Sequence, residues 1–131
     1  MASLDTSCLL RWLIGDQPDQ ARAVDDLIRR EGRVVVPDAV LLEAVFVMSG
    51  PYGLSRADVA AALAAVLGEG AMAVDVPLWS AVTQDYLAHP KLSVVDVYLA
   101  HLARGDHDEP LFTFDRKLAA QMAGTELVRP G

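Results

Sequence analysis

Cysteine, long apolar runs and positive charge are all scarce in this sequence. The single cysteine, Cys8, cannot form a disulfide within the chain, which fits a reducing cytoplasm. The longest apolar stretches, around residues 39–48 and 59–67, are shorter than the roughly 18 uninterrupted apolar residues of a membrane helix. No basic segment precedes an apolar run at the N-terminus, so we expect no signal peptide and no membrane association.

The net charge of −7 is the second bulk constraint. A plain nucleic-acid-binding module needs a basic surface to contact phosphates, so this composition argues against one. An enzyme that reaches phosphates through bound cations is still compatible with an acidic chain, because the ions bring the positive charge to the site.

Short apolar stretches alternate with helical patterns along the 131 residues, and no linker divides the chain. This alternation predicts one domain over residues 1–131, of the α/β class, with a mostly parallel sheet of four to five short strands and helices on both faces. The expected strands are a very short first strand that ends within 2–5, then 33–37, 71–77, a buried 111–114 and a possible last strand at 126–128. The expected helices are 6–14, 16–32, 38–49, 55–68, 78–88, 93–105 and 115–124.

Two aspartates follow expected strands. Asp5 comes after the first strand and Asp115 after the fourth. Ligands of parallel α/β folds bind beyond the carboxyl ends of the strands, so both side chains are candidate site residues. Each also precedes a helix, where aspartate is among the best N-caps, and that interpretation stays open.

Two further carboxylates lie on helices with apolar surroundings. In VLLEAVFVM (40–48), Glu43 has only apolar neighbours three and four residues away, so we expect it in a packed surface where it needs a partner. Asp96 comes three residues after Ser93, which also allows it to complete a capping box. An exposed glutamate and a helix cap are the alternatives for these two.

The four carboxylates together predict more than each does alone. Oxygen-only ligands suit hard cations such as Mg²⁺ or Mn²⁺. Without a metal, clustered carboxylates repel one another and resist ionisation. A divalent ion removes this repulsion, activates water and stabilises the leaving oxygen of a phosphodiester.

Four motifs in this order resemble those of the PIN-domain nucleases, and specifically the VapC-like toxins of bacterial toxin–antitoxin pairs. The resemblance covers nearly the whole chain. The motifs are LDTSCLL (4–10), VVVPDAVLLE (34–43), DVYLAHLA (96–103) and TFDRKLA (113–119).

The resemblance implies a metal-dependent endoribonuclease with a PIN-like three-layer fold. One or two Mg²⁺ or Mn²⁺ ions would be bound by Asp5, Asp96, Glu43 and Asp115. Asp5 and Asp96 are the first candidates for direct metal ligands, and Glu43 and Asp115 would complete the shell directly or through water. Thr6, Thr113 and Arg116 would contact the carboxylates or the RNA substrate. The resemblance also implies a small cognate antitoxin as partner, and a homodimer.

Other functions were weighed on the same residues. A non-catalytic binding module with the PIN fold is the main alternative, although all four acids are present. A receiver-type phosphorylation domain needs an acidic pair after the first strand and an aspartate after the third, and the chain has neither. A phosphatase of the haloacid dehalogenase type needs Asp-x-Asp, whereas Thr6 and Ser7 follow Asp5.

Overall fold

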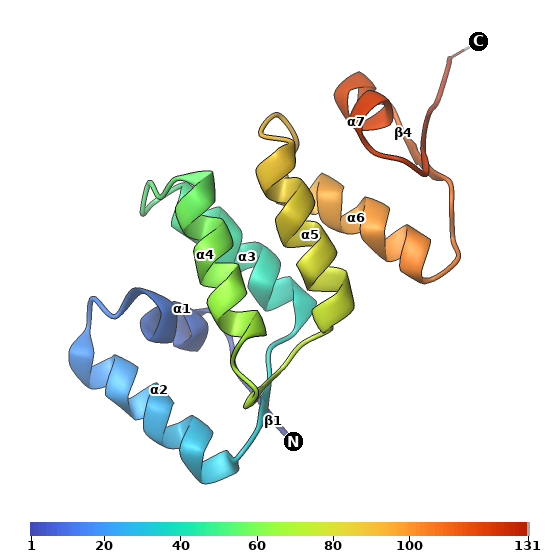
Figure 1. Cartoon of the computed structure of the whole chain (residues 1–131). Coiled ribbons are helices and arrows are strands. Elements are labelled where there is room, and N and C mark those ends of the chain that lie inside the picture. The colour runs from blue at the N-terminus through green and yellow to red at the C-terminus, as the bar shows by residue number, and fades with distance from the viewer. Residues whose placement is uncertain (131) are drawn as a thin grey trace. The chain divides into compact units, whose positions relative to one another are not determined.

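The computed structural model describes residues 1–130 and divides the chain into two compact units, Met1–Val76 and Pro77–Gly131 (Figure 1). Parallel strands and helices alternate in both, which confirms the predicted α/β class. The expectation of a single domain over residues 1–131 stays a prediction. No helix within residues 1–130 is long and apolar enough to cross a membrane.

The first unit is built on a three-stranded parallel sheet of order β1-β2-β3. Ala2 and Ser3 pair with Val34 and Val35, and these in turn pair with Met72 and Ala73. The strands are β1 (Ala2–Ser3), β2 (Val34–Val35) and β3 (Met72–Ala73), and the helices are α1 (Thr6–Ile14), α2 (Pro18–Glu31), α3 (Asp38–Ser49) and α4 (Arg56–Leu67). In this unit α1 packs against α2 and α3, and α3 packs against α4 (Figure 1).

Local signals explain where the helices of the first unit begin and end. Helix α1 starts after the N-cap Asp5 and stops at Gly15, whose positive φ of 69° suits glycine. Helix α4 starts after Ser55, whose side chain accepts a hydrogen bond from the backbone N–H of Asp58. Apolar side chains close the core beneath these helices, and Leu9, Ala44 and Val59 are fully buried.

The second unit pairs two parallel strands and adds three helices. Leu111, Phe112 and Thr113 are in register with Thr125, Glu126 and Leu127, and helix α7 packs on both strands. Trp79 is fully buried and stacks on Tyr98, with ring centroids 5.4 Å apart. The elements are α5 (Val76–Ala88), α6 (Val94–Gly105), β4 (Leu111–Thr113), α7 (Arg116–Gln121) and β5 (Thr125–Leu127).

Two expectations about the strands are wrong. The stretch 71–77 is not a strand throughout, because β3 ends at Ala73 and α5 already begins at Val76. The stretch 111–114 is not buried, since Phe112 and Phe114 are 62% and 72% exposed. An apolar run alone does not say whether a neighbouring element covers both faces of a strand, and here no side chain of β4 is buried.

Candidate active site

Asp5 is fixed by the start of helix α1. Its Oδ1 accepts hydrogen bonds from the Ser7 hydroxyl, at 2.7 Å, and from the Cys8 backbone N–H, at 3.0 Å. These bonds, led by that of the Cys8 N–H, lower the pKa of the exposed Asp5 carboxyl and keep it ionised. Both end on Oδ1 and leave Oδ2 outside the cap. Burial, more than the nearby Asp5, raises the pKa of Cys8, so this residue is a thiol rather than a reactive thiolate.

The lowered pKa of Asp5 predicts a pH-dependent part of the stability. A carboxylate with a lower pKa in the folded state stabilises the fold above its unfolded pKa, and this contribution disappears as the pH falls through the folded pKa. Asparagine caps helices as well as aspartate but does not ionise. We therefore expect the stability difference between wild type and Asp5→Asn to be constant near neutral pH and to shrink below about pH 4.

Urea unfolding at several pH values measures this difference. Asp26→Asn is the matched control, because Asp26 is an exposed aspartate without a hydrogen bond or ion pair among residues 1–130. A stability difference for Asp5→Asn that does not change with pH would contradict the role of the carboxylate charge.

Glu43 lies on α3, but its surroundings differ from those expected. The side chain is exposed, and Phe46, one turn further along the helix, is 72% exposed. The expectation that Glu43 lies in a packed surface is therefore wrong. Every side of α3 is apolar, so the sequence could not show which side packs. Among residues 1–130 the Glu43 carboxylate has no hydrogen bond or ion pair, which leaves it available to a ligand.

Asp96 lies in the first turn of α6, where the structure separates two interpretations. The Ser93 hydroxyl oxygen accepts a hydrogen bond from the Asp96 backbone N–H at 3.2 Å, so Ser93 caps the helix. The reciprocal bond of a capping box, from the Ser93 N–H to the Asp96 carboxylate, is not formed within residues 1–130. The half-buried Asp96 carboxylate therefore has no structural partner in the part of the chain that is described.

Asp115 follows β4 and caps α7. Its Oδ1 accepts hydrogen bonds from the backbone N–H groups of Lys117, at 2.9 Å, and Leu118, at 3.2 Å. Its own backbone N–H donates to Thr113 Oγ1 at 2.9 Å. Thr113 thus fixes the turn that presents Asp115, and within residues 1–130 its hydroxyl proton is not donated to any group. Thr6 is the first residue of α1, half-exposed and directly after Asp5.

The four acids are shared between the units, with Asp5 and Glu43 in the first and Asp96 and Asp115 in the second. Within residues 1–130, no three histidine, cysteine, aspartate or glutamate side chains form a group that could hold a metal ion. The structure therefore gives the setting of each acid separately. Their assembly into one site stays a prediction.

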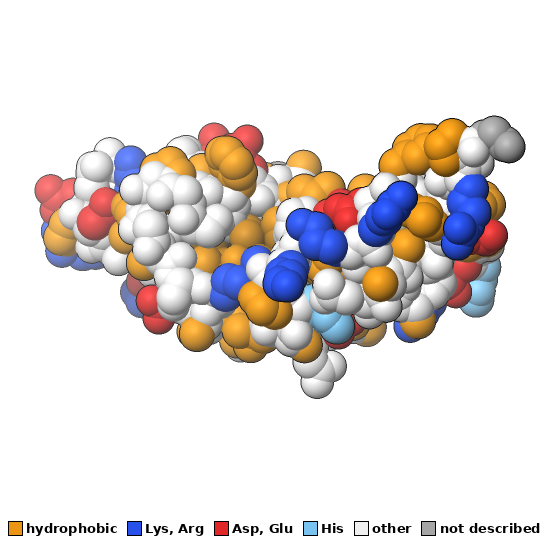
Figure 2. Space-filling view, turned by 90° about the horizontal axis from the view of Figure 1, so that it is seen from above, with side chains coloured by type: hydrophobic (Ala, Val, Ile, Leu, Met, Phe, Trp, Pro, Cys, Tyr) orange, Lys and Arg blue, Asp and Glu red, His pale blue; other side chains and the backbone are white. Residues whose placement is uncertain are grey.

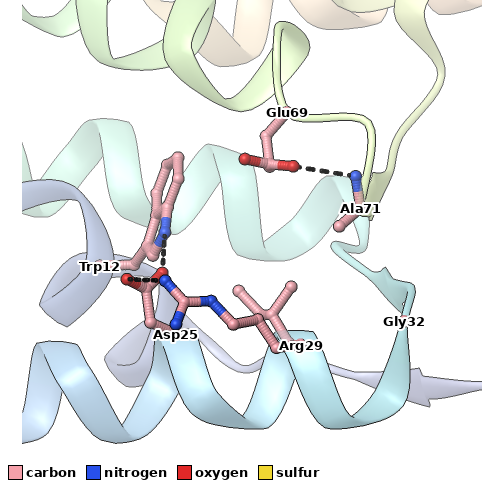
Figure 3. Close-up of a pocket in the computed structure, with 7 residues that line it drawn as sticks. Trp12, Asp25, Arg29, Gly32, Glu69 and Ala71 are labelled. Atoms are coloured by element: carbon pink, nitrogen blue, oxygen red, sulfur yellow. Dashed lines mark hydrogen bonds and ion pairs between the residues drawn. The ribbon is translucent and has the colours of Figure 1, made fainter.

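The first unit also contains a hollow of about 390 Å³ between α1, α2 and the segment after α4 (Figure 3). The Trp12 indole N–H donates to Asp25 Oδ1 at 3.2 Å, and the Arg29 guanidinium lies 3.9 Å from the other oxygen of Asp25. Glu69 accepts the backbone N–H of Ala71 at 3.1 Å. These polar groups are hydrogen-bonded or ion-paired with protein groups, so we interpret them as structural contacts that hold α1 against α2.

A cluster of histidines in the second unit has a similar structural character. The Asp85 carboxylate lies 2.6 Å from His101 Nε2 and 3.7 Å from His89 Nε2, and His89 Nδ1 lies 3.1 Å from Gln121 Oε1. These contacts link α5, α6 and α7. The residues of this cluster are engaged with one another rather than with any of the four acids.

Arg116 was expected to contact substrate, and the structure places it at the start of α7, exposed and without a protein partner among residues 1–130. It lines a hollow together with Arg129, which the sequence analysis did not single out. Arg129 comes just after β5. Its position beyond the end of a strand, as for Asp115, is the signal that could have identified it.

Comparison with protein-family models gives a match to the PIN domain over residues 2–123. The chain belongs to the PIN domain family. The match includes all four acids, takes in most of both units and ends before β5. Comparison with curated proteins and with solved structures gives no match.

PIN domains have a nuclease-type fold, are usually nucleases, and usually bind divalent metal ions. The residues of this PIN domain fit such an ion by their chemistry. The Glu43 and Asp96 carboxylates are unbonded within residues 1–130, and Asp5 and Asp115 use Oδ1 alone for their caps. Oxygen ligands of this kind are those that Mg²⁺ and Mn²⁺ prefer.

Proposed function

We propose that this PIN domain is a Mg²⁺- or Mn²⁺-dependent endoribonuclease that acts as the toxin of a type II toxin–antitoxin pair. The observation that supports the nuclease part best is the state of Asp96. Ser93 caps the helix without help from the Asp96 carboxylate. A half-buried carboxylate that has no protein partner within residues 1–130 is suited to a cation. A non-catalytic PIN-fold binding module is the alternative.

In this proposal Asp5, Asp96, Glu43 and Asp115 hold one or two ions. When bound, the ion supplies the positive charge that favours attack of water on a phosphodiester and stabilises the leaving oxygen. The caps formed by Asp5 and Asp115 fix both carboxylates in one orientation, so little side-chain freedom is lost on binding.

The neighbouring polar side chains would position the RNA. Thr113 already accepts the Asp115 backbone N–H, so its hydroxyl proton is available for a phosphate oxygen. The Thr6 hydroxyl lies next to Asp5 in sequence and would act in the same way. Arg116 brings a guanidinium, which matches the geometry of a phosphate.

The decisive experiment is cleavage of a mixed RNA pool by the purified chain, with Mg²⁺ or Mn²⁺ compared with EDTA. We expect discrete fragments that need the metal, and we expect Asp5→Asn to abolish them while it keeps the helix cap. Asp26→Asn should cleave like wild type. Fragments that persist in EDTA or with Asp5→Asn would count against the proposal, and a folded chain that binds RNA without cutting it would favour the binding module.

Expression in bacterial cells extends the same test to the toxin role. We expect induced wild type to stop growth and Asp5→Asn to leave growth unchanged, because only the cleavage is lost. The proposed partners are a small antitoxin and a second copy of the chain. Phe46, exposed on the same side of α3 as Glu43, would give the antitoxin an apolar contact near the acids. Growth that continues during wild-type expression would contradict the toxin role.

A further inference from the structure

The second unit contains a groove between the start of α7 and the segment after β5. Two hollows of about 580 Å³ and 340 Å³ form it, and Arg116, Leu127 and Arg129 line both. Phe114 lines the smaller hollow and Glu126 the larger one. We call this feature the arginine groove.

Among residues 1–130, Arg116 and Arg129 of the arginine groove are unpaired, as Arg30 and Arg33 also are, whereas several other arginines have a carboxylate partner. Arg11, Arg22, Arg29 and Arg104 each lie close to a carboxylate. Neither Arg116 nor Arg129 has a hydrogen bond or ion pair among residues 1–130, and both are exposed. Glu126 is the acidic side chain of the lining, and it also has no protein partner there. The groove therefore offers two free guanidinium groups against one carboxylate.

An aromatic ring lies beside these charges. Phe114 is 72% exposed, as the other two phenylalanines of the chain largely are, and it is the one that lines the groove. Basic and hydrophobic side chains occur next to one another on the face seen in Figure 2. An exposed aromatic ring beside cations is the arrangement by which proteins hold single-stranded nucleic acid, because bases stack on the ring while the cations contact phosphates.

The position of the groove connects it to the proposed chemistry. Strands β4 and β5 are parallel, so the residues that follow them lie at the same edge of the pair. Phe114, Asp115 and Arg116 follow β4, and Arg129 follows β5. A hydrogen bond of 2.8 Å from the Val128 N–H to the Thr113 carbonyl extends the pairing to this edge. A strand bound in the groove would thus pass next to Asp115.

We infer that the arginine groove binds a single-stranded segment of RNA, with Arg116 and Arg129 on phosphates and the Phe114 ring stacked on a base. The inference rests on the proposed ribonuclease function and adds to it the residues that hold the substrate strand. An acidic protein segment would use the two arginines but gains little from the exposed ring, so RNA fits the whole lining better.

The test measures binding separately from cleavage. Fluorescence anisotropy is recorded with a labelled single-stranded RNA of randomised sequence, in EDTA, with each variant made in the Asp96→Asn chain. We expect Phe114→Ala to weaken binding about 5-fold or more, with unchanged salt dependence. Arg129→Gln should weaken binding and reduce the slope of log K against log salt by about 0.7, the value for one phosphate contact with a single strand.

Matched controls lie in the same unit. Phe112→Ala removes an exposed phenyl ring of the same strand that does not line the groove. Arg104→Gln removes an exposed arginine that is paired with Glu109. Both should bind RNA within about 2-fold of the parent. Circular dichroism checks that every variant is folded.

The outcomes separate this inference from the proposed function. One outcome would refute the groove alone: wild type cleaves RNA with metal, but Phe114→Ala and Arg129→Gln bind RNA as tightly as the parent. The proposed RNA-binding role of the groove would then be wrong, and the proposed nuclease activity would stand. Loss of binding in both variants, without cleavage by wild type, would support the groove and refute the nuclease. Binding of poly-glutamate as tightly as RNA, through the same two residues, would assign the groove to an acidic protein partner and overturn the inference.

Discussion

Asp96→Asn is expected to lower metal-dependent RNA cleavage at least about 100-fold, because metal ions contribute several kcal/mol to phosphodiester cleavage and each 1.4 kcal/mol is a factor of ten. The fold should tolerate the change, since Ser93 caps α6 through the Asp96 backbone N–H and the carboxylate has no protein partner in residues 1–130. Single-turnover cleavage with saturating Mg²⁺ measures the effect.

Thermal unfolding gives a second measurement of the same variant. If the ion binds the folded chain as proposed, millimolar Mg²⁺ or Mn²⁺ should raise the melting temperature of wild type by mass action, and Asp96→Asn should remove most of this rise. Asp58→Asn is the matched control. Asp58 follows Ser55 as Asp96 follows Ser93, and its backbone N–H donates to the Ser55 hydroxyl oxygen at 3.1 Å. An equal loss in both variants, or an unchanged metal effect in Asp96→Asn, would place the ion elsewhere.

Trp79→Ala is expected to have the largest effect on stability, with a loss of about 3–5 kcal/mol. The indole is completely buried and stacks on Tyr98 at an interplanar angle of 28°. Its removal leaves a cavity and deletes an aromatic pair. A typical domain is stable by only about 5–15 kcal/mol, so the variant should unfold at a much lower urea concentration.

Trp12→Ala provides the comparison, since the chain has two tryptophans in different settings. Trp12 is half-exposed and donates one hydrogen bond, to Asp25. We expect its loss to cost clearly less than that of Trp79. Urea unfolding followed by circular dichroism, which does not depend on tryptophan as a probe, compares the two. An equal loss of unfolding free energy in Trp79→Ala and Trp12→Ala would show that the burial of Trp79 does not give it a larger effect on stability.

The helices were the most predictable part of the fold because their signals are local. Residues 6–14 and 38–49 were expected as helices and are helical over the same bounds. The start and stop signals of the first helix, Asp5 and Gly15, are its direct neighbours in sequence. The strands were predicted in the right order, and the first was correctly expected to be very short. The expected strands 33–37 and 71–77 are longer than β2 and β3, because the length of a strand depends on a partner that is distant in sequence.

Burial was less predictable than secondary structure. Glu43 and Phe114 both lie in apolar sequence, and both are exposed. An apolar neighbour in sequence indicates that a surface can pack, whereas burial depends on whether another element covers that surface. For the candidate site, the sequence supplied the four acids as predictions, but it could not show that Ser93 leaves the Asp96 carboxylate unbonded within residues 1–130.

Asp5 and Asp115 each cap a helix with one carboxylate oxygen, and this has a genetic consequence. A change of the first base of an aspartate codon from G to A gives asparagine, which removes the charge and keeps the cap. If the proposed function is correct, this single-base change would abolish the activity of the enzyme without unfolding it. The product would be a decoy that keeps the surfaces for the antitoxin and for RNA, and that competes with active copies for both.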